Sequence, residues 1–220
     1  MSPQALDAAA AEVATKLPGG GGPGDRVPDD PGGDGRGGGD QPQAMLYRLG
    51  LALALASIAA LFISLVVVYV VRSRTATYWQ PVHPPPALWI STGMLLASSL
   101  TFEWARRALA KGEWLVYWRR VLLTAWLGAS FLGAQLLALW GLYGRGYHMK
   151  GNPHASEFYL FAGLHGAHLI GGLVVLMWLL ARRSENRPRT RLAAELSAIY
   201  WHFMGLVWLG LFMVLMVVGR

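Results

Sequence analysis

The chain has 220 residues, of which 54% are hydrophobic and 14% are charged, and its formal net charge is +7. This composition is too apolar for an ordinary soluble domain and too poor in charge for a nucleic-acid-binding protein. The sequence contains no cysteine, which excludes a disulfide, an iron–sulfur cluster, a thiolate zinc site and a thiolate-bridged copper centre.

The first 45 residues differ in composition from the rest of the chain. They hold three cations against seven acids, so the remaining residues carry a net charge of +11. Residues 17–40 are mostly Gly, Pro and Asp, a composition that cannot bury enough apolar surface to fold. The start of the chain also lacks the basic segment and apolar core of a secretory signal peptide. We therefore expect residues 1–45 to form a disordered cytoplasmic tail before a folded domain, residues 46–220.

Five apolar segments follow this tail. Each is close to the length of about 20 residues that a helix needs to cross the hydrocarbon core of a bilayer. The expected spans are about 49–71, 87–109, 121–143, 157–180 and 197–218. The sequence therefore predicts an all-α, polytopic membrane protein with a five-transmembrane-helix bundle.

The loops between the expected spans differ in charge. The loops after the second and fourth spans carry ten cations near them, and the alternate loops carry four. The ten are Arg106, Arg107, Lys111, Arg119, Arg120, Arg182, Arg183, Arg187, Arg189 and Arg191, and the four are Arg72, Arg74, Arg145 and Lys150. The positive-inside rule then predicts a cytoplasmic N-terminus and a periplasmic or extracellular C-terminus in a bacterial inner (plasma) membrane.

Small residues recur at every fourth position on three of the expected spans. Such spacing lets helix backbones approach each other closely in lipid. We expect these three stripes to be close-packing faces. They are Ala52, Ala56 and Ala60; Ala125, Ala129 and Gly133; and Gly163, Ala167 and Gly171.

Polar side chains inside the spans are costly and are therefore the first candidates for a functional site. These candidates are Glu103, Gln135, His165, His168 and His202. His165 and His168 are three residues apart and can share a helix face, with His202 as a third nitrogen donor for zinc or copper. No carboxylate or thiolate stands beside them at ligand spacing. A metal site, a haem site and a structural role in helix packing all stay open.

Glu103 lies about one helical turn from Arg106 and Arg107. This spacing favours an ion pair near the cytoplasmic end of the second span, and a proton-relay carboxylate is the alternative. The chain has no nucleophile elbow, phosphate-binding loop or other catalytic motif. The sequence therefore predicts no catalytic residue.

Four segments, in order along the chain, resemble the motifs of one known family. They are PPPALWISTGMLLASSLT (84–101), WLGASFLGAQ (126–135), FYLFAGLHGAHLIGG (158–172) and YWHFMGLVWLGLF (200–212). The family that they resemble is subunit III of the haem–copper oxidases, and the length is similar to its short, five-helix form. The motif residues are Gln135, His165, Gly166, His168, Gly172, Trp201, His202, Phe203 and Trp208. The resemblance implies that their roles are structural and interhelical.

The same resemblance implies a function without chemistry of the chain's own. In this family, haem and copper belong to the partner subunit, and subunit III carries no redox centre or metal. It packs beside catalytic subunit I, in an enzyme that also has subunit II, and encloses structural phospholipid. The chain is then expected to support assembly and proton uptake of a proton-translocating oxidase in aerobic electron transport.

The chain departs from the family pattern at three positions that often carry an acid. They are Ser91, Ala138 and Gly205. The missing carboxylates are compatible with a divergent branch, so a subunit III-like companion of nitric oxide reductase stays open as an alternative. A stand-alone haem- or metal-binding membrane protein is the alternative of another class.

Overall fold

A computed structural model describes residues 40–75, 87–144, 153–181 and 187–218 of the chain. Apart from a turn at Gly112 and Glu113, these residues are all helical, which confirms the all-α prediction. The helices are α2 (Asp40–Thr75), α3 (Ala87–Lys111), α4 (Trp114–Gly144), α5 (Pro153–Ala181) and α6 (Arg187–Val218).

Helix α2 begins earlier than the expected end of the N-terminal tail at residue 45. Its first turn contains Asp40 and Pro42. An acid is favourable beside the positive end of the helix dipole, and proline is tolerated in a first turn because its missing N–H needs no partner there. The boundary is therefore Asp40, and the rest of the expected tail, residues 1–39, lies outside the described residues.

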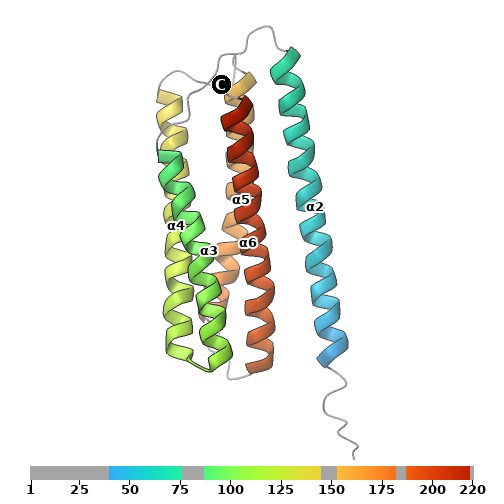
Figure 1. Cartoon of the computed structure of the whole chain (residues 1–220), viewed down its shortest axis with the longest axis vertical. Coiled ribbons are helices and arrows are strands. Elements are labelled where there is room, and N and C mark those ends of the chain that lie inside the picture. Colours follow the sequence, from blue (N-terminus) through green and yellow to red (C-terminus); the bar gives the residue numbers. More distant parts are fainter. Residues whose placement is uncertain (1–39, 76–86, 145–152, 182–186, 219–220) are drawn as a thin grey trace, which may run out of the picture. The chain divides into compact units, whose positions relative to one another are not determined.

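Four of the helices pack side by side. Helix α3 contacts α4 and α6, and α5 contacts the same two helices, so each of the four touches two neighbours. Helix α2 packs outside them against α5 and α6, and within the described residues it touches neither α3 nor α4. Successive helices run in opposite directions (Figure 1). This alternation is what successive crossings of a membrane require.

Four helices are long and apolar enough to cross a membrane by length and composition: α2, α4, α5 and α6. Helix α3 differs because it carries several hydroxyl side chains and the charges of Glu103, Arg106 and Arg107. It nevertheless runs antiparallel to α4 along the bundle (Figure 1), and its hydroxyl side chains face the interior. Its composition suits a helix surrounded by protein on several sides.

A tight turn joins α3 to α4. Gly112 has a φ of 81°, and its N–H donates to the carbonyl of Leu109 at 3.1 Å. The N–H of Glu113 donates to the carbonyl of Ala108 at 3.0 Å. These two bonds form a Schellman motif, which ends a helix with a left-handed residue that is usually glycine. The turn brings the two helices together as an antiparallel pair.

The three small-residue stripes do not pack inside this chain, so that prediction is wrong for the described residues. Ala129, Gly133, Gly163, Ala167 and Gly171 are exposed, as are all three alanines of the stripe on α2. A side-chain carbon added to Gly133 or Gly163 would meet no atom within 4 Å. The spacing reports where a backbone can be approached, and it does not report which surface this chain's own helices use.

Candidate functional site: the buried core shared by the helices

The closest helix packing surrounds Trp201 of α6, which is buried. A Cβ atom on Gly128 of α4 would lie 2.7 Å from two carbons of the indole, and one on Gly172 of α5 would lie 3.2 Å from two others. The indole Nε1 donates to Ser98 Oγ of α3 at 3.0 Å. Trp201 therefore touches all three neighbouring helices, and the two glycines leave the space that it occupies.

Trp208 lies two turns further along the same face of α6 and is also buried. Its Nε1 donates to Thr92 Oγ1 of α3 at 3.0 Å. Its ring packs against Phe131 of α4 and His165 of α5, with centroids 5.2 and 5.1 Å apart. The two tryptophans thus repeat one arrangement, in which an indole from α6 spans the bundle and bonds to a hydroxyl of α3.

The hydroxyls of α3 can accept these bonds because each donates its own proton within the helix. Ser91, Thr92 and Ser98 donate to carbonyls one turn earlier, at 3.0, 2.7 and 2.6 Å. Their oxygens then accept from the two indoles and from Gln135 of α4, whose Nε2 lies 3.1 Å from Ser91 Oγ. The Ser/Thr-rich sequence of α3 therefore joins it to both α4 and α6 through buried hydrogen bonds.

The three positions that lack a family acid lie in or beside this core. Ser91 bonds to Gln135, and Ala138 is buried one turn further along the same side of α4. Gly205 is buried in α6, and a Cβ there would lie 3.4 Å from Ser99 Oγ. In this chain a neutral hydrogen bond and small side chains therefore take the place of buried carboxylates.

His165 lies in the interior of the helices and is 1% exposed. Its ring contacts aromatic rings of three other helices, with centroid distances of 6.4 Å to Phe62 of α2, 5.9 Å to Phe131 of α4 and 5.1 Å to Trp208 of α6. Neither ring nitrogen has a hydrogen-bond partner in the described part of the chain. His165 is therefore the residue at which α2, α4, α5 and α6 meet.

His168 faces α2, one turn from His165. Its Nδ1 donates to the carbonyl of Leu164 at 2.8 Å, and its ring lies 5.7 Å from that of Phe62. The backbone carbonyl of His168 accepts a hydrogen bond from Tyr200 Oη of α6 at 2.8 Å. The two histidines thus both contact Phe62 and form the seat for α2.

The remaining motif residues pack around this core. Gly166 faces α4, where a Cβ would lie 3.6 Å from Leu132 Cδ2, and Phe203 is half-buried against the core. His202 is half-buried on α6 and interacts electrostatically with Glu103 and Arg106 of α3. Among the described residues, no group of three His, Cys, Asp or Glu side chains could hold a metal ion. The structure does not bring the three histidines together as one ligand set.

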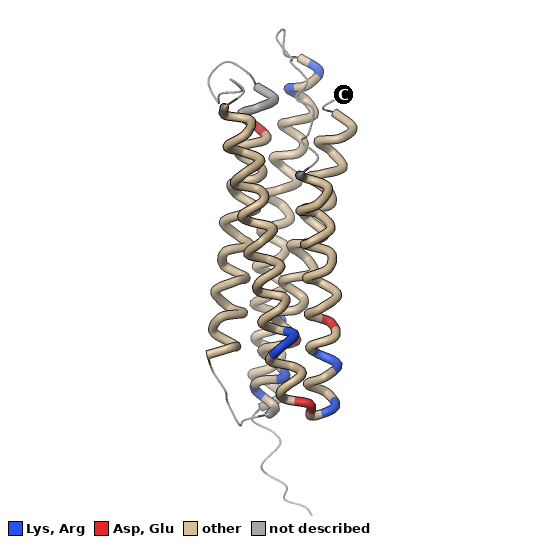
Figure 2. The backbone as a smooth tube through the Cα atoms, turned by 90° about the vertical axis from the view of Figure 1, so that its left-hand side faces the viewer, with Lys and Arg blue, Asp and Glu red and all other residues tan. Residues whose placement is uncertain are grey.

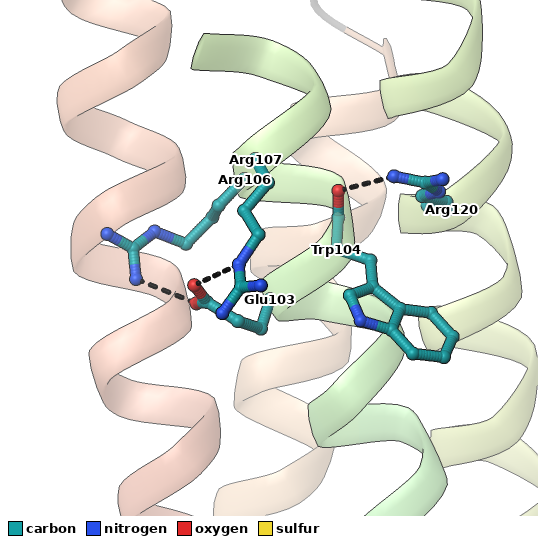
Figure 3. A network of polar contacts seen from close by, with 5 residues as sticks. All are labelled: Glu103, Trp104, Arg106, Arg107 and Arg120. Carbon is teal, nitrogen blue, oxygen red and sulfur yellow. Dashed lines mark hydrogen bonds and ion pairs between the residues drawn. The ribbon is translucent and has the colours of Figure 1, made fainter. Parts of the chain in front are cut away.

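Glu103 is held by two arginines of its own helix. Arg106 Nη1 donates to Oε2 at 3.0 Å, and Arg107 Nε donates to Oε1 at 3.3 Å. Figure 3 shows Arg106 extended across the front of α6, the helix that carries His202. On the other side, Arg120 of α4 donates to the carbonyl of Trp104 at 2.7 Å. The carboxylate therefore has the geometry of the expected ion pair.

Two interhelical ion pairs were not predicted from the sequence. Arg72 of α2 donates to Glu157 of α5 at 2.8 Å, and Glu157 is only 4% exposed. Arg48, near the other end of α2, pairs with Glu195 of α6 at 3.1 Å. The available signal was a lone acid at the start of an apolar run and a cation at the matching end of another. Charges at span ends are so common that this signal does not select a partner.

The fold and the core define a class of protein: a polytopic helical membrane protein whose buried polar groups serve contacts between helices. Residues 40–220 match the family described as "Cytochrome c oxidase subunit III". This match covers all five helices, and the chain belongs to that family.

Relatives from distant organisms agree with this assignment. A "Probable cytochrome c oxidase subunit 3" of Nocardia farcinica is 31% identical over 173 residues, which cover 76% of this chain and 85% of the relative. The "Cytochrome c oxidase subunit 3" of Thermostichus vulcanus is 29% identical over 184 residues, or 78% of this chain and 87% of the relative. A protein of the same name from Branchiostoma lanceolatum is 33% identical over 141 residues, or 61% and 53% of the two chains.

Proposed function

We propose that this chain is the non-catalytic integral membrane subunit III of a respiratory haem–copper terminal oxidase. It packs beside catalytic subunit I, in an enzyme that also contains subunit II, and it supports assembly, lipid binding and proton uptake during aerobic electron transport. Haem and copper belong to the partner. The enzyme carries out the redox chemistry, and this chain contributes a rigid helical surface.

One observation carries the proposal. The motif residues that could have held a cofactor instead make contacts between helices: Trp201 bonds to Ser98, Trp208 bonds to Thr92, and His165 packs among aromatic rings. A haem or metal site would need ligands that converge on an open position. A core in which these side chains join four helices supports a structural subunit.

The distribution of charge supports a cytoplasmic N-terminus. Among the described residues, nine Lys and Arg lie toward the end of the helices at which α2 begins, and two lie toward the other end (Figure 2). The two are Arg72 and Arg74. Because cytoplasmic loops are enriched in cations, we place the first end in the cytoplasm of a bacterial plasma membrane.

The surface of α2 supports a role in lipid binding. Most of this helix is exposed, including the apolar side chains of Leu53, Ile63, Val67 and Val71. An apolar helix surface of this kind is solvated by acyl chains in a bilayer. We propose that structural phospholipid covers it where the partner subunit does not.

Co-purification with absorption spectroscopy tests the proposal. A tagged chain purified from native membranes should bring down an oxygen-reducing catalytic subunit with haem and copper. The same chain expressed alone should show no Soret band and no stoichiometric metal. A nitric oxide reductase in the first experiment would support the alternative partner. A haem spectrum of the isolated chain that is lost in the His165→Ala, His168→Ala double variant would refute the structural role.

A further inference from the structure

Two buried polar groups in the core have unused hydrogen-bonding capacity. Gln135 Oε1 and both ring nitrogens of His165 have no hydrogen-bond partner in the described part of the chain. Gln135 is 5% exposed and His165 is 1% exposed. Rotating the amide of Gln135 by 180° would exchange the atom that bonds to Ser91, and it would leave the other amide atom without a partner. The unused capacity is therefore independent of the amide orientation.

The two groups belong to one layer of the core. Gln135 lies one turn from Phe131 on the buried side of α4, and Phe131 contacts the His165 ring at 5.9 Å. From the other side, Trp208 packs on His165 at 5.1 Å and bonds to Thr92, which is adjacent to the Ser91 that holds Gln135. Both groups therefore border the same Phe131–Trp208 contact.

The chemistry of the two groups is complementary. A neutral imidazole offers one N–H donor and one acceptor nitrogen, and an amide oxygen accepts. An unpaired buried polar group loses its hydration without compensation, and aromatic rings replace that hydration only weakly. A molecule that both donates and accepts would satisfy the imidazole N–H and the amide oxygen together. Buried water does this in protein interiors, where it bonds to groups that have no other partner.

We propose that His165 and Gln135 form an internal site for one ordered water molecule, which links α5 to α4. The water accepts from the imidazole N–H and donates to Gln135 Oε1. The site is independent of the proposed function, because it concerns two side chains within this chain and no partner. It gives the second polar motif residue of α4–α5 a specific ligand, where family membership assigns none.

A double-mutant cycle tests the site through stability. Gln135→Leu, His165→Phe and the double variant would be compared by thermal unfolding of the full chain in lipid nanodiscs. Removing one partner leaves the water and the other partner unsatisfied, so each single variant should lower Tm by about 2–4 °C. The double variant should lose clearly less than the sum of the two. Additive effects, or a rise in Tm in both single variants, would overturn the proposal, because independent unpaired groups gain from apolar replacement.

A directly bonded pair provides the control for this cycle. Thr101 Oγ1 and Thr124 Oγ1 lie 2.8 Å apart between α3 and α4, so Thr101→Val and Thr124→Val should couple without a mediating molecule. A density map at a resolution that shows waters gives a second readout on the unchanged protein. A solvent peak within hydrogen-bond distance of both His165 and Gln135 is expected. No peak there, or a peak with the anomalous signal of a metal, would contradict a water site even if a variant fails to fold.

Discussion

At the scale of single residues, the core depends on where large and small side chains meet. Trp201 fits between α4 and α5 because both Gly128 and Gly172 lack a Cβ atom at the points of contact. The sequence predicted that Trp201 and Gly172 act between helices, but it gave no reason to choose Gly128. Glycines are common in membrane helices, and the residue that selects Gly128 lies 73 positions later in the chain.

Gly128→Ala should therefore destabilise the protein. The added carbon would lie 2.7 Å from the indole of Trp201, which is fixed on its other side by Gly172. We expect the free energy of unfolding to fall by about 1–3 kcal/mol, as for other overpacked sites. Thermal or denaturant unfolding in nanodiscs measures it.

Gly133→Ala is the matched control, because the same change on the same helix would meet no atom within 4 Å. It should be neutral or stabilising by up to about 1 kcal/mol, since alanine favours a helix over glycine. Equal losses in the two variants would show that contact with Trp201 is not the cause.

Ser98 provides a second test at this scale. Ser98→Ala removes the acceptor of the Trp201 Nε1 and leaves a buried N–H without a partner. Hydrogen bonds between membrane helices contribute about 0.6 kcal/mol on average, with a maximum near 1.7 kcal/mol. We expect a loss in this range in the unfolding free energy. Ser57→Ala on α2, where the exposed hydroxyl bonds only to its own helix, should leave stability unchanged.

At the scale of helices, the number of elements was predictable and their neighbours were not. Runs of about 20 apolar residues identify membrane helices because backbone groups in lipid must bond within the segment. Which helices touch depends on buried pairs far apart in sequence, such as Phe62 with His165 and His168. The spacing of the two histidines suggested a shared ligand, whereas their common neighbour is an aromatic ring of α2.

Helix α2 is held by few contacts, which makes it the helix most sensitive to a single change. Phe62 and Tyr69 are buried on one side of it, and ion pairs of Arg48 and Arg72 hold its ends. Arg72→Gln would leave the buried carboxylate of Glu157 without its cation. Because Arg72 is about half exposed, we expect a loss of about 1–2 kcal/mol, below that of a fully buried pair.

Hydrogen exchange of the α2 backbone would locate this loss. Exchange should become faster along the half of α2 that contains Arg72, while the α3–α4 pair stays protected. Arg74→Gln provides the comparison, because Arg74 is exposed two residues away and makes no hydrogen bond or ion pair within the described residues. The ion pair would be irrelevant to α2 if both variants exchanged like the unchanged protein.

At the scale of the whole molecule, the uneven charge of the two ends and the alternation of the helices describe one arrangement in the membrane. Helix α3 is the critical element, because it alone among the five described helices is not apolar enough to be identified as a span by composition. Its position is nevertheless set by its neighbours. Helices α2 and α4 run in the same direction, so α3 must return the chain to the side where α2 began (Figure 1).

Single cysteines would test this arrangement directly, since the chain contains none of its own. Arg74 lies at the end of α2 and Lys111 at the end of α3, and both are exposed. If α3 crosses the membrane and the cation-rich end is cytoplasmic, an impermeant maleimide should label Arg74→Cys in intact cells. It should label Lys111→Cys only in inverted vesicles. Reversed labelling would contradict the proposed orientation, and labelling of both positions from one side would show that α3 does not cross.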